Sequence, residues 1–131
     1  MNRRTLAACI CAFLAADLNR SVIAEEVHMP LVRIAQLEID PERLESYTAA
    51  VKEEIETSIR VEPGVLAIYA VAEKDNPSKL RFFEIYADEI AYNAHINSAH
   101  FIKYVDATKD MITSKTLIET VPIQQAPSGG V

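Results

Sequence analysis

Three features of the sequence predict a single α+β domain with the element order β-α-β-β-α-β. The chain has 131 residues, which is about the size of one domain. Half of these residues are apolar, as is typical of a globular protein. Strand-like segments alternate with segments of helical period along most of the chain. The resulting order is the split βαβ arrangement of ferredoxin-like folds.

The first half of the domain is predicted to contain a strand, a helix and a second strand. Residues 31–39 are rich in β-branched and aliphatic side chains without a helical period, which indicates a strand. Asp40, followed by proline, is typical of a helix start, and apolar residues at threes and fours continue to about Ile59. The sequence Glu-Pro-Gly at 62–64 ends this helix. The apolar run 65–73 predicts a strand that is buried on both faces.

The second half is predicted to contain a strand, two helical stretches and a last strand. Residues 74–78 have the composition of a hairpin loop. In the strand that follows, alternation places Glu84 and Tyr86 on one face and Phe83 on the other. Asn97 and Ser98 interrupt the helical pattern. The predicted bounds are 80–86 and 115–121 for the strands, and 88–95 and 99–112 for the helical stretches.

Composition argues against several classes of function. The formal net charge of −6 disfavours non-specific nucleic-acid binding, which needs a basic surface. Only 3 glycines are present, too few for a dinucleotide fold with a glycine-rich turn in so short a chain. Both cysteines, Cys9 and Cys11, lie near the N-terminus. No cysteine framework therefore spans the predicted domain.

Residues 1–24 are predicted to be a secretory signal peptide. Arg3 and Arg4 precede the apolar run 6–16, which is too short to span a bilayer but has the length of a signal-peptide core. Val22 and Ala24 are small residues at the −3 and −1 positions of a cleavage site after residue 24. We therefore expect a periplasmic or secreted protein.

Two alternatives for the N-terminus remain open. Residues 6–9 are similar to a lipoprotein box ending at Cys9, although few residues precede that cysteine. Alternatively, Met29 is the true start, and the protein is cytoplasmic. In either case the predicted domain covers residues 29–123, and residues 124–131 are predicted to form a flexible tail.

Glu84 is the first candidate for chemistry because it is a carboxylate in a strongly apolar strand. Burial without partners would cost several kcal/mol. Either Glu84 is exposed or paired with Arg33 or Arg81, or it lies in a cleft and orients a histidine or a substrate hydroxyl. The break at 97–98 could bring His95 and His100 together, and with Glu84 they could form a two-histidine, one-carboxylate metal site. Structural roles for both histidines are the alternative.

A set of aromatic side chains falls within the predicted strands and helices. Most of them are expected in the core. A pocket between sheet and helices would nevertheless be lined by such rings, and it would favour a flat aromatic or quinone-like ligand. The set comprises Tyr69, Phe82, Phe83, Tyr86, Tyr92, Phe101 and Tyr104.

Three motifs in order resemble the antibiotic biosynthesis monooxygenase family, in particular its small quinol monooxygenase-like members. They are E-P-G at 62–64, E-x-Y at Glu84 and Tyr86, and A-x-x-x-H-x-x-x-x-H-F at 91–101. The resemblance covers about residues 29–123. It implies a dimeric α+β barrel, in which two ferredoxin-like protomers pack their sheets together and each keeps a pocket between sheet and helices.

The activity implied by the resemblance is that of a cofactor-independent monooxygenase, which oxidises a quinol or polyphenol with O2 and uses no metal, flavin or haem. In that scheme a base removes a phenolic proton and the substrate anion passes an electron to oxygen. The haem-degrading members rely on a tryptophan, which this chain lacks. Two alternatives stay open: a cofactor-free isomerase or lyase in the same pocket, and a non-catalytic module that binds a small aromatic molecule.

The resemblance also assigns roles to individual residues. His95 would be the base or hydrogen-bond donor, and Glu84 would orient a histidine. Pattern alone adds Tyr69, Tyr104 and Phe83 to the substrate-binding residues, and no cofactor-binding or metal-binding residue is assigned. The predicted substrate-binding set is Tyr86, His100, Phe101, Tyr69, Tyr104 and Phe83. The enzymatic hypothesis depends on Glu84 and His95 facing one cavity.

Overall fold

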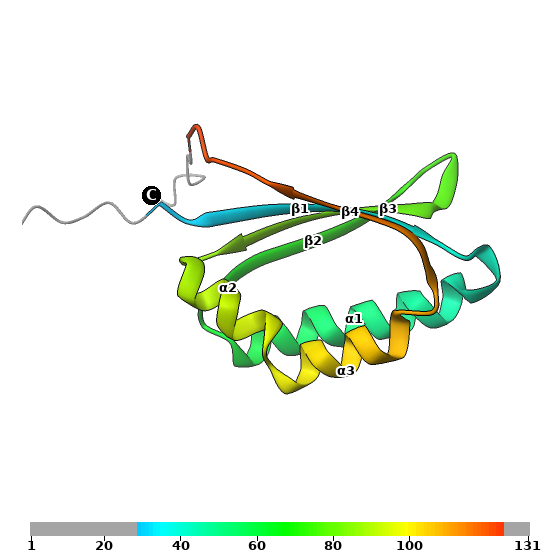
Figure 1. Cartoon of the computed structure of the whole chain (residues 1–131), viewed down its shortest axis with the longest axis horizontal. Helices are drawn as coiled ribbons and strands as arrows, with labels where there is room; N and C mark the ends of the chain where they lie inside the picture. Colours follow the sequence, from blue (N-terminus) through cyan, green and yellow to red (C-terminus); the bar gives the residue numbers. More distant parts are fainter. Residues whose placement is uncertain (1–28, 125–131) are drawn as a thin grey trace, which may run out of the picture.

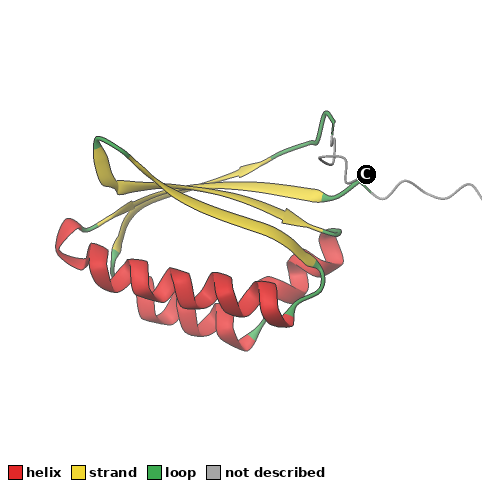
Figure 2. Cartoon of the chain, turned by 180° about the vertical axis from the view of Figure 1, so that it is seen from behind, coloured by secondary structure: helices red, strands yellow, loops and turns green. Residues whose placement is uncertain are grey.

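A computed structural model describes residues 29–124 as a four-stranded antiparallel sheet with helices covering one face (Figure 1). The view from behind in Figure 2 shows the same two layers. The predicted signal peptide, both cysteines and the tail from residue 125 onward lie outside the described residues. The elements are β1 (Leu31–Ile39), a 3-10 turn (Pro41–Arg43), α1 (Leu44–Val61), β2 (Val65–Glu73), β3 (Asn76–Tyr86), α2 (Glu89–Ile96), α3 (Ala99–Thr108) and β4 (Ile112–Glu119).

The sheet has the strand order β2-β3-β1-β4, so β1 and β3 lie in the middle and β2 and β4 form the edges. This arrangement confirms the predicted α+β class and the ferredoxin-like topology. None of the helices in residues 29–124 is both long and apolar enough to cross a lipid bilayer.

Each helical segment begins at a polar cap that the sequence specifies. The Asp40 carboxylate accepts a hydrogen bond from the Glu42 N–H at 3.0 Å, before the 3-10 turn that leads into α1. Asp88 caps α2 through the Ala91 N–H at 2.7 Å, and Ser98 caps α3 through the Phe101 N–H at 3.3 Å. The cap at Ser98 explains the predicted break between the two helices.

The core lies between α1 and the inward face of the sheet. Tyr47 and Val51 of α1 are buried against alternate residues of the central strands, such as Leu37 and Phe82. Two polar residues of α1, Glu54 and Ser58, continue the same buried row. A helix face that buries a carboxylate needs a partner for it, and the site described below supplies one.

Strand β2 is not buried on both faces, contrary to the prediction from its apolar run. Tyr69 is 65% exposed and Val71 is 57% exposed, because the helices cover only one face of the sheet. Phe83 of β3 is the strand partner of Tyr69, and it is 44% exposed on the same side of the sheet. We call this surface the outer sheet face. Its apolar members include Ile34, Tyr69, Val71, Phe83, Ile85 and Ile118.

The segment between α3 and β4 also differs from the prediction. Helix α3 ends at Thr108, and β4 already begins at Ile112, where a helix was predicted to end. The Met111 N–H donates to the Thr108 carbonyl, and the Met111 carbonyl accepts from the Asp40 N–H at 2.9 Å. These bonds turn the chain into the sheet beside β1, so tertiary pairing overrides the local helical pattern.

Candidate active site

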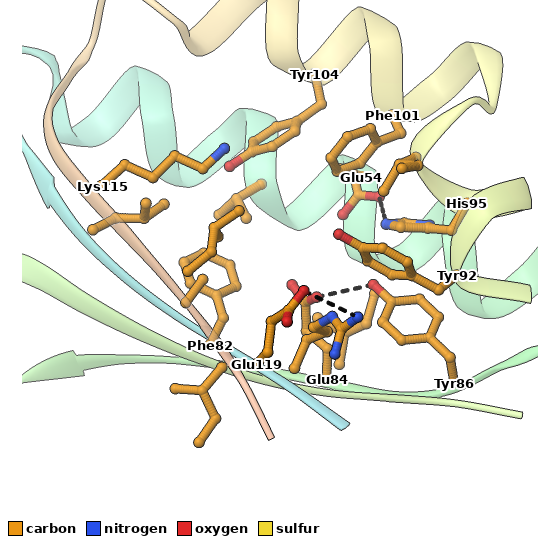
Figure 3. Close-up of a pocket in the computed structure, with 18 residues that line it drawn as sticks. Glu54, Phe82, Glu84, Tyr86, Tyr92, His95, Phe101, Tyr104, Lys115 and Glu119 are labelled. Atoms are coloured by element: carbon orange, nitrogen blue, oxygen red, sulfur yellow. Dashed lines mark hydrogen bonds and ion pairs between the residues drawn. The ribbon is translucent and has the colours of Figure 1, made fainter. Parts of the chain in front are cut away.

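A cavity of about 140 Å³ lies between the inward face of the sheet and the helices, towards the β4 edge (Figure 3). Both Glu84 and His95 line this cavity, which is the arrangement on which the enzymatic hypothesis depends. We call it the main cavity. Its polar and aromatic lining residues are Arg33, Glu54, Phe82, Glu84, Tyr86, Tyr92, His95, Phe101, Tyr104, Lys115 and Glu119.

The floor of the main cavity consists of three rows of paired residues that cross the sheet. Strand register places each β1 residue between a β3 and a β4 partner, and every second residue of a strand points to the same face. The first row is charged, the second is apolar and the third ends in a lysine. The rows are Glu84–Arg33–Glu119, Phe82–Ala35–Leu117 and Leu80–Leu37–Lys115.

Glu84 occupies the charged row and is mostly buried. Its carboxylate accepts a hydrogen bond from the Tyr86 hydroxyl at 2.9 Å. Burial raises the pKa of Glu84, and the hydrogen bond from Tyr86 only partly opposes this. Arg33 lies directly opposite on β1, whereas Arg81 points to the other face and pairs with Glu73. Glu84 thus contacts a phenol rather than orienting a histidine as predicted.

His95 stands at the wall of the main cavity between two carboxylates. Its side chain is 2% exposed. Nδ1 lies 2.8 Å from Glu62 Oε2, and Nε2 lies 3.6 Å from Glu54 Oε1, the contact drawn in Figure 3. The rings of Phe101 and Tyr86 pack against the imidazole with centroids 4.7 Å and 5.3 Å away. The imidazole is therefore held in one orientation.

Glu62 joins the two histidines, because its Oε2 atom also lies 2.8 Å from Nε2 of His100. Burial raises the pKa of Glu62, but the hydrogen bonds and the charges of the two histidines outweigh burial and lower it overall. An ionised carboxylate can only accept hydrogen bonds. Nδ1 of His95 therefore donates to Glu62, and Nε2 lies on the other side of the ring, 3.6 Å from Glu54 Oε1 at the wall of the main cavity.

The turn after α1 brings this arrangement together. The Glu62 N–H donates to the Ser58 carbonyl at 2.9 Å and closes the last turn of the helix. A Cβ atom on Gly64 would lie 2.5 Å from the Cβ of Ala91, so only glycine lets α2 approach this closely. The E-P-G motif thus supplies both a partner for His95 and the space for the helix that carries it.

Glu54 and Glu62 were missed as site residues by sequence reasoning. Glu54 is buried, and its Oε1 atom accepts a hydrogen bond from the Ser58 hydroxyl at 2.6 Å. A signal was present in the helix, because Glu54 follows Tyr47 and Val51 at core spacing. For Glu62 the only signal was its place in the Glu-Pro-Gly motif, and that motif by itself indicates only the end of a helix.

The predicted metal constellation of Glu84 with both histidines is not formed. Glu54, His95 and His100 instead each offer a ligand atom, and these atoms lie within 4.8 Å of one another. These three residues could hold a divalent ion. Glu62 already accepts a hydrogen bond from each histidine, so the cluster is also satisfied as a hydrogen-bond network.

Three of the predicted substrate-binding residues, Tyr86, Phe101 and Tyr104, line the main cavity. The hydroxyl of Tyr104 lies 2.6 Å from that of Tyr47 on α1, and burial raises the pKa of Tyr104. The phenol of Tyr104 therefore stays neutral. His100 does not line the main cavity. It borders a smaller hollow between α1 and α3 and shares the Glu62 carboxylate with His95.

Tyr69 and Phe83 were predicted to bind substrate, but they do not line the main cavity. Both belong to the outer sheet face, on the opposite side of the sheet from the main cavity. Strand alternation explains this, because Phe82 and Glu84 point inward and their neighbour Phe83 must point outward. Aromatic character alone did not distinguish the two faces.

Comparisons with known proteins agree on one family. A model of the antibiotic biosynthesis monooxygenase family matches residues 30–107. A crystal structure from Bacteroides thetaiotaomicron, of a protein assigned as an antibiotic biosynthesis monooxygenase, is 50% identical, with a TM-score of 0.71, and covers 78% of this chain and 95% of that one.

Two further relatives are more distant. A Fusobacterium nucleatum structure assigned as a monooxygenase is 27% identical, with a TM-score of 0.74, over 82% of this chain and 49% of its own. A curated, uncharacterised protein of Synechocystis is 23% identical over 96 residues, which make up 73% of this chain. The match spans 65% of that protein, just under two thirds of its length.

Proposed function

This chain belongs to the antibiotic biosynthesis monooxygenase family, and we propose that it oxidises a quinol or polyphenolic small molecule with O2, without metal, flavin or haem. The family and the assigned neighbours support a monooxygenase-like function. The observation that supports the specific proposal is the Glu62–His95 pair, in which Glu62 binds Nδ1 and leaves Nε2 of the imidazole as the candidate base at the wall of an aromatic-lined cavity.

The first step in this mechanism is removal of a phenolic proton by Nε2 of His95. Glu62 keeps the proton of the neutral ring on Nδ1, so Nε2 is free to accept. The imidazolium that forms lies between two carboxylates, since Glu54 Oε1 is 3.6 Å from Nε2.

The second step is the reaction of the phenolate with O2. The phenolate gives one electron to O2, and the resulting phenoxyl radical and superoxide combine to form a C–O bond. His95 returns its proton to the peroxide, and the loss of one water leaves a carbonyl group, so that a phenol and O2 yield a quinone and water. Aromatic walls from Tyr86, Phe101 and Tyr104 would exclude bulk water from these intermediates.

Oxygen uptake with a dihydroxynaphthalene tests this proposal. We expect the purified protein to consume O2 and form the quinone, and His95→Ala to reduce the rate about 100-fold, the usual scale for the loss of a general base. His95→Gln serves as a second, less disruptive variant. Asn93→Ala, at an exposed position on the same helix, is the matched control. Equal rates for wild type and both His95 variants would remove His95 from the mechanism.

The same assay under anaerobic conditions separates the alternatives. Substrate turnover without O2 would favour an isomerase or lyase over a monooxygenase. Tight binding of a small aromatic ligand without turnover would favour a non-catalytic module. Quinone formation that requires O2 supports the proposed reaction.

We also propose that the protein is a homodimer joined through the outer sheet face. This face carries exposed apolar side chains, among them Tyr69, Val71 and Phe83, without cover from a helix. Contiguous apolar surface of this kind is typical of a protein interface. Tyr69 and Phe83 would then be buried by the partner's sheet, as the family resemblance implies.

Export of the protein is a further proposal, supported by the signal-peptide pattern of residues 1–24. N-terminal sequencing of protein recovered from the periplasm or medium of its host tests it. A start at residue 25 is expected. Recovery from the cytoplasm with a start at Met29 would contradict it.

A further inference from the structure

We propose that the substrate carries an anionic group and that Lys115 on β4 binds this group at the end of the main cavity remote from His95. This inference rests on the proposed function, because it concerns the ligand of the same site. It adds a class of substrate, an aromatic acid or aromatic phosphate with a hydroxyl group at its other end.

Lys115 lies where two cavities meet. It lines the main cavity and also a second cavity of about 210 Å³ between α3 and β4. Leu37, Phe101 and Tyr104 line both cavities as well, so the two adjoin beneath the β4 edge. Figure 3 shows Lys115 on the opposite side of the main cavity from His95 and Tyr86. The groove is therefore long, apolar in the middle and different in charge at its two ends.

The two ends of the groove differ in their ionisable groups. Glu54 lies at the His95 end, 3.6 Å from Nε2, where its carboxylate would repel an anion. Lys115 has no carboxylate within 4.0 Å among the described residues, so its charge is available to a ligand. A substrate with one hydroxyl and one anionic group would thus bind in one direction, with its hydroxyl beside His95.

Arg33, the other cation of the main cavity, is already engaged. Its guanidinium lies 5.0 Å from the centre of the Tyr92 ring and 3.8 Å from the Glu119 carboxylate. It also faces Glu84 across the strand pair. These contacts leave Lys115 as the better partner for a ligand anion.

The length of the cavity floor favours a substrate with more than one aromatic ring. Lys115 and Glu119 belong to the third and first rows, and four residues of an extended strand span about 13 Å. A single phenol ring does not reach from His95 to the lysine end of such a floor. A fused-ring compound with a carboxylate or phosphate group does, with Phe82 and Leu117 of the apolar row beneath its rings.

Calorimetric titration with matched naphthalene probes tests this inference without turnover. The probes are 2-naphthol, 6-hydroxy-2-naphthoate and 2-naphthyl phosphate. We expect at least one anionic probe to bind wild type roughly fivefold more tightly than 2-naphthol, the scale of one partly exposed ion pair. The probe that binds more tightly identifies the anionic group as carboxylate or phosphate.

Two lysine variants supply the comparison. Lys115→Gln should abolish the preference for the anionic probe and leave 2-naphthol binding unchanged, whereas Lys115→Arg should retain the preference. Lys79→Gln removes the same charge from a lysine that pairs with Glu38, away from the main cavity, and should change nothing. A preference that persists in Lys115→Gln, or no preference in wild type, would overturn the inference.

The outcome is separable from that of the proposed function. Oxygen uptake that depends on His95, without any anion preference, would support the monooxygenase and reject the role of Lys115. An anion preference lost in Lys115→Gln, without oxygen uptake, would support the anion site and reject the proposed reaction.

Discussion

The carboxylate of Glu62 accepts a hydrogen bond from Nδ1 of His95 at 2.8 Å, across a separation of 33 residues in the chain. One residue belongs to the turn after α1, and the other to the end of α2. The contact fixes which imidazole nitrogen faces the main cavity. Glu62, which the sequence indicates only as a helix stop, is therefore a direct partner of the proposed base.

Glu62→Gln should lower kcat/KM for the quinol by at least about 100-fold. The amide has no negative charge to stabilise the imidazolium, and its NH2 group can donate to Nδ1 and so place the ring proton on Nε2. Steady-state oxygen uptake measures the effect. Glu56→Gln, a substitution at an exposed position of the preceding helix α1, should behave as wild type. Unchanged kinetics in Glu62→Gln would show that the pair does not serve the reaction.

Glu84→Gln should flatten the pH dependence of stability. Because the pKa of Glu84 is raised in the folded state, its contribution is fully present below the unfolded value and is lost as pH rises through the folded one. The free energy of unfolding of wild type should thus fall relative to the variant as pH increases from about 4 to about 8. Urea denaturation across this range measures the difference. A constant difference between the two proteins would contradict the buried placement of the carboxyl group.

Glu62 should have the opposite dependence. Its folded pKa is lowered, so its contribution is present above the unfolded value and is lost as pH falls through the folded one. A denaturation series on Glu62→Gln that extends below pH 4.5, the ordinary value of the carboxyl group, therefore provides an internal control, in which the loss of stability relative to wild type shrinks on acidification.

Gly64→Ala should destabilise the fold by about 1–3 kcal/mol, the usual cost of overpacking. The added methyl group would meet the Cβ of Ala91 at 2.5 Å and push α2 away from the turn. Thermal and urea unfolding measure this loss. Ala91→Gly removes the opposing methyl group, so the double variant should lose less stability than the sum of the two single variants. Strict additivity would mean that the two positions do not contact each other.

Phe83→Glu should convert the proposed dimer into a monomer. The substitution places a charge in the middle of the outer sheet face, where burial against a second copy would be costly. Sedimentation equilibrium measures the mass. Ile90→Glu changes an apolar residue of α2 that is 79% exposed, remote from that face, and should leave the dimer intact. A monomeric wild type would refute the proposal directly.

The fold could be predicted from the sequence because local signals agreed with tertiary structure. The cap at Asp40 and the helix start at Asp88 formed, and the helical pattern breaks at Asn97 and Ser98 as predicted. The exceptions arose where burial depends on what covers a strand. An apolar run cannot show whether a second layer lies above it, so the exposed face of β2 was predicted as buried.

The site was predicted only in part for a similar reason. Motif order and strand alternation located Glu84 and His95, which line one cavity. The partner of His95, however, is separated from it by a whole hairpin, and only the packing of α2 against the turn shows which carboxylate it meets. Glu54 was overlooked because it lies among the many acidic residues of α1.

The placement of Glu54 and Glu62 on and just after one helix limits how this protein can change length. Each residue added to an α-helix turns everything beyond it by about 100°. A single insertion between these positions would carry Glu62 away from both imidazoles and would also turn Ser58 out of its buried position. We therefore expect deletions and insertions to be tolerated in the β2–β3 hairpin, whereas the number of residues between Glu54 and Glu62 is constrained both by the buried face of α1 and by the contacts of Glu62.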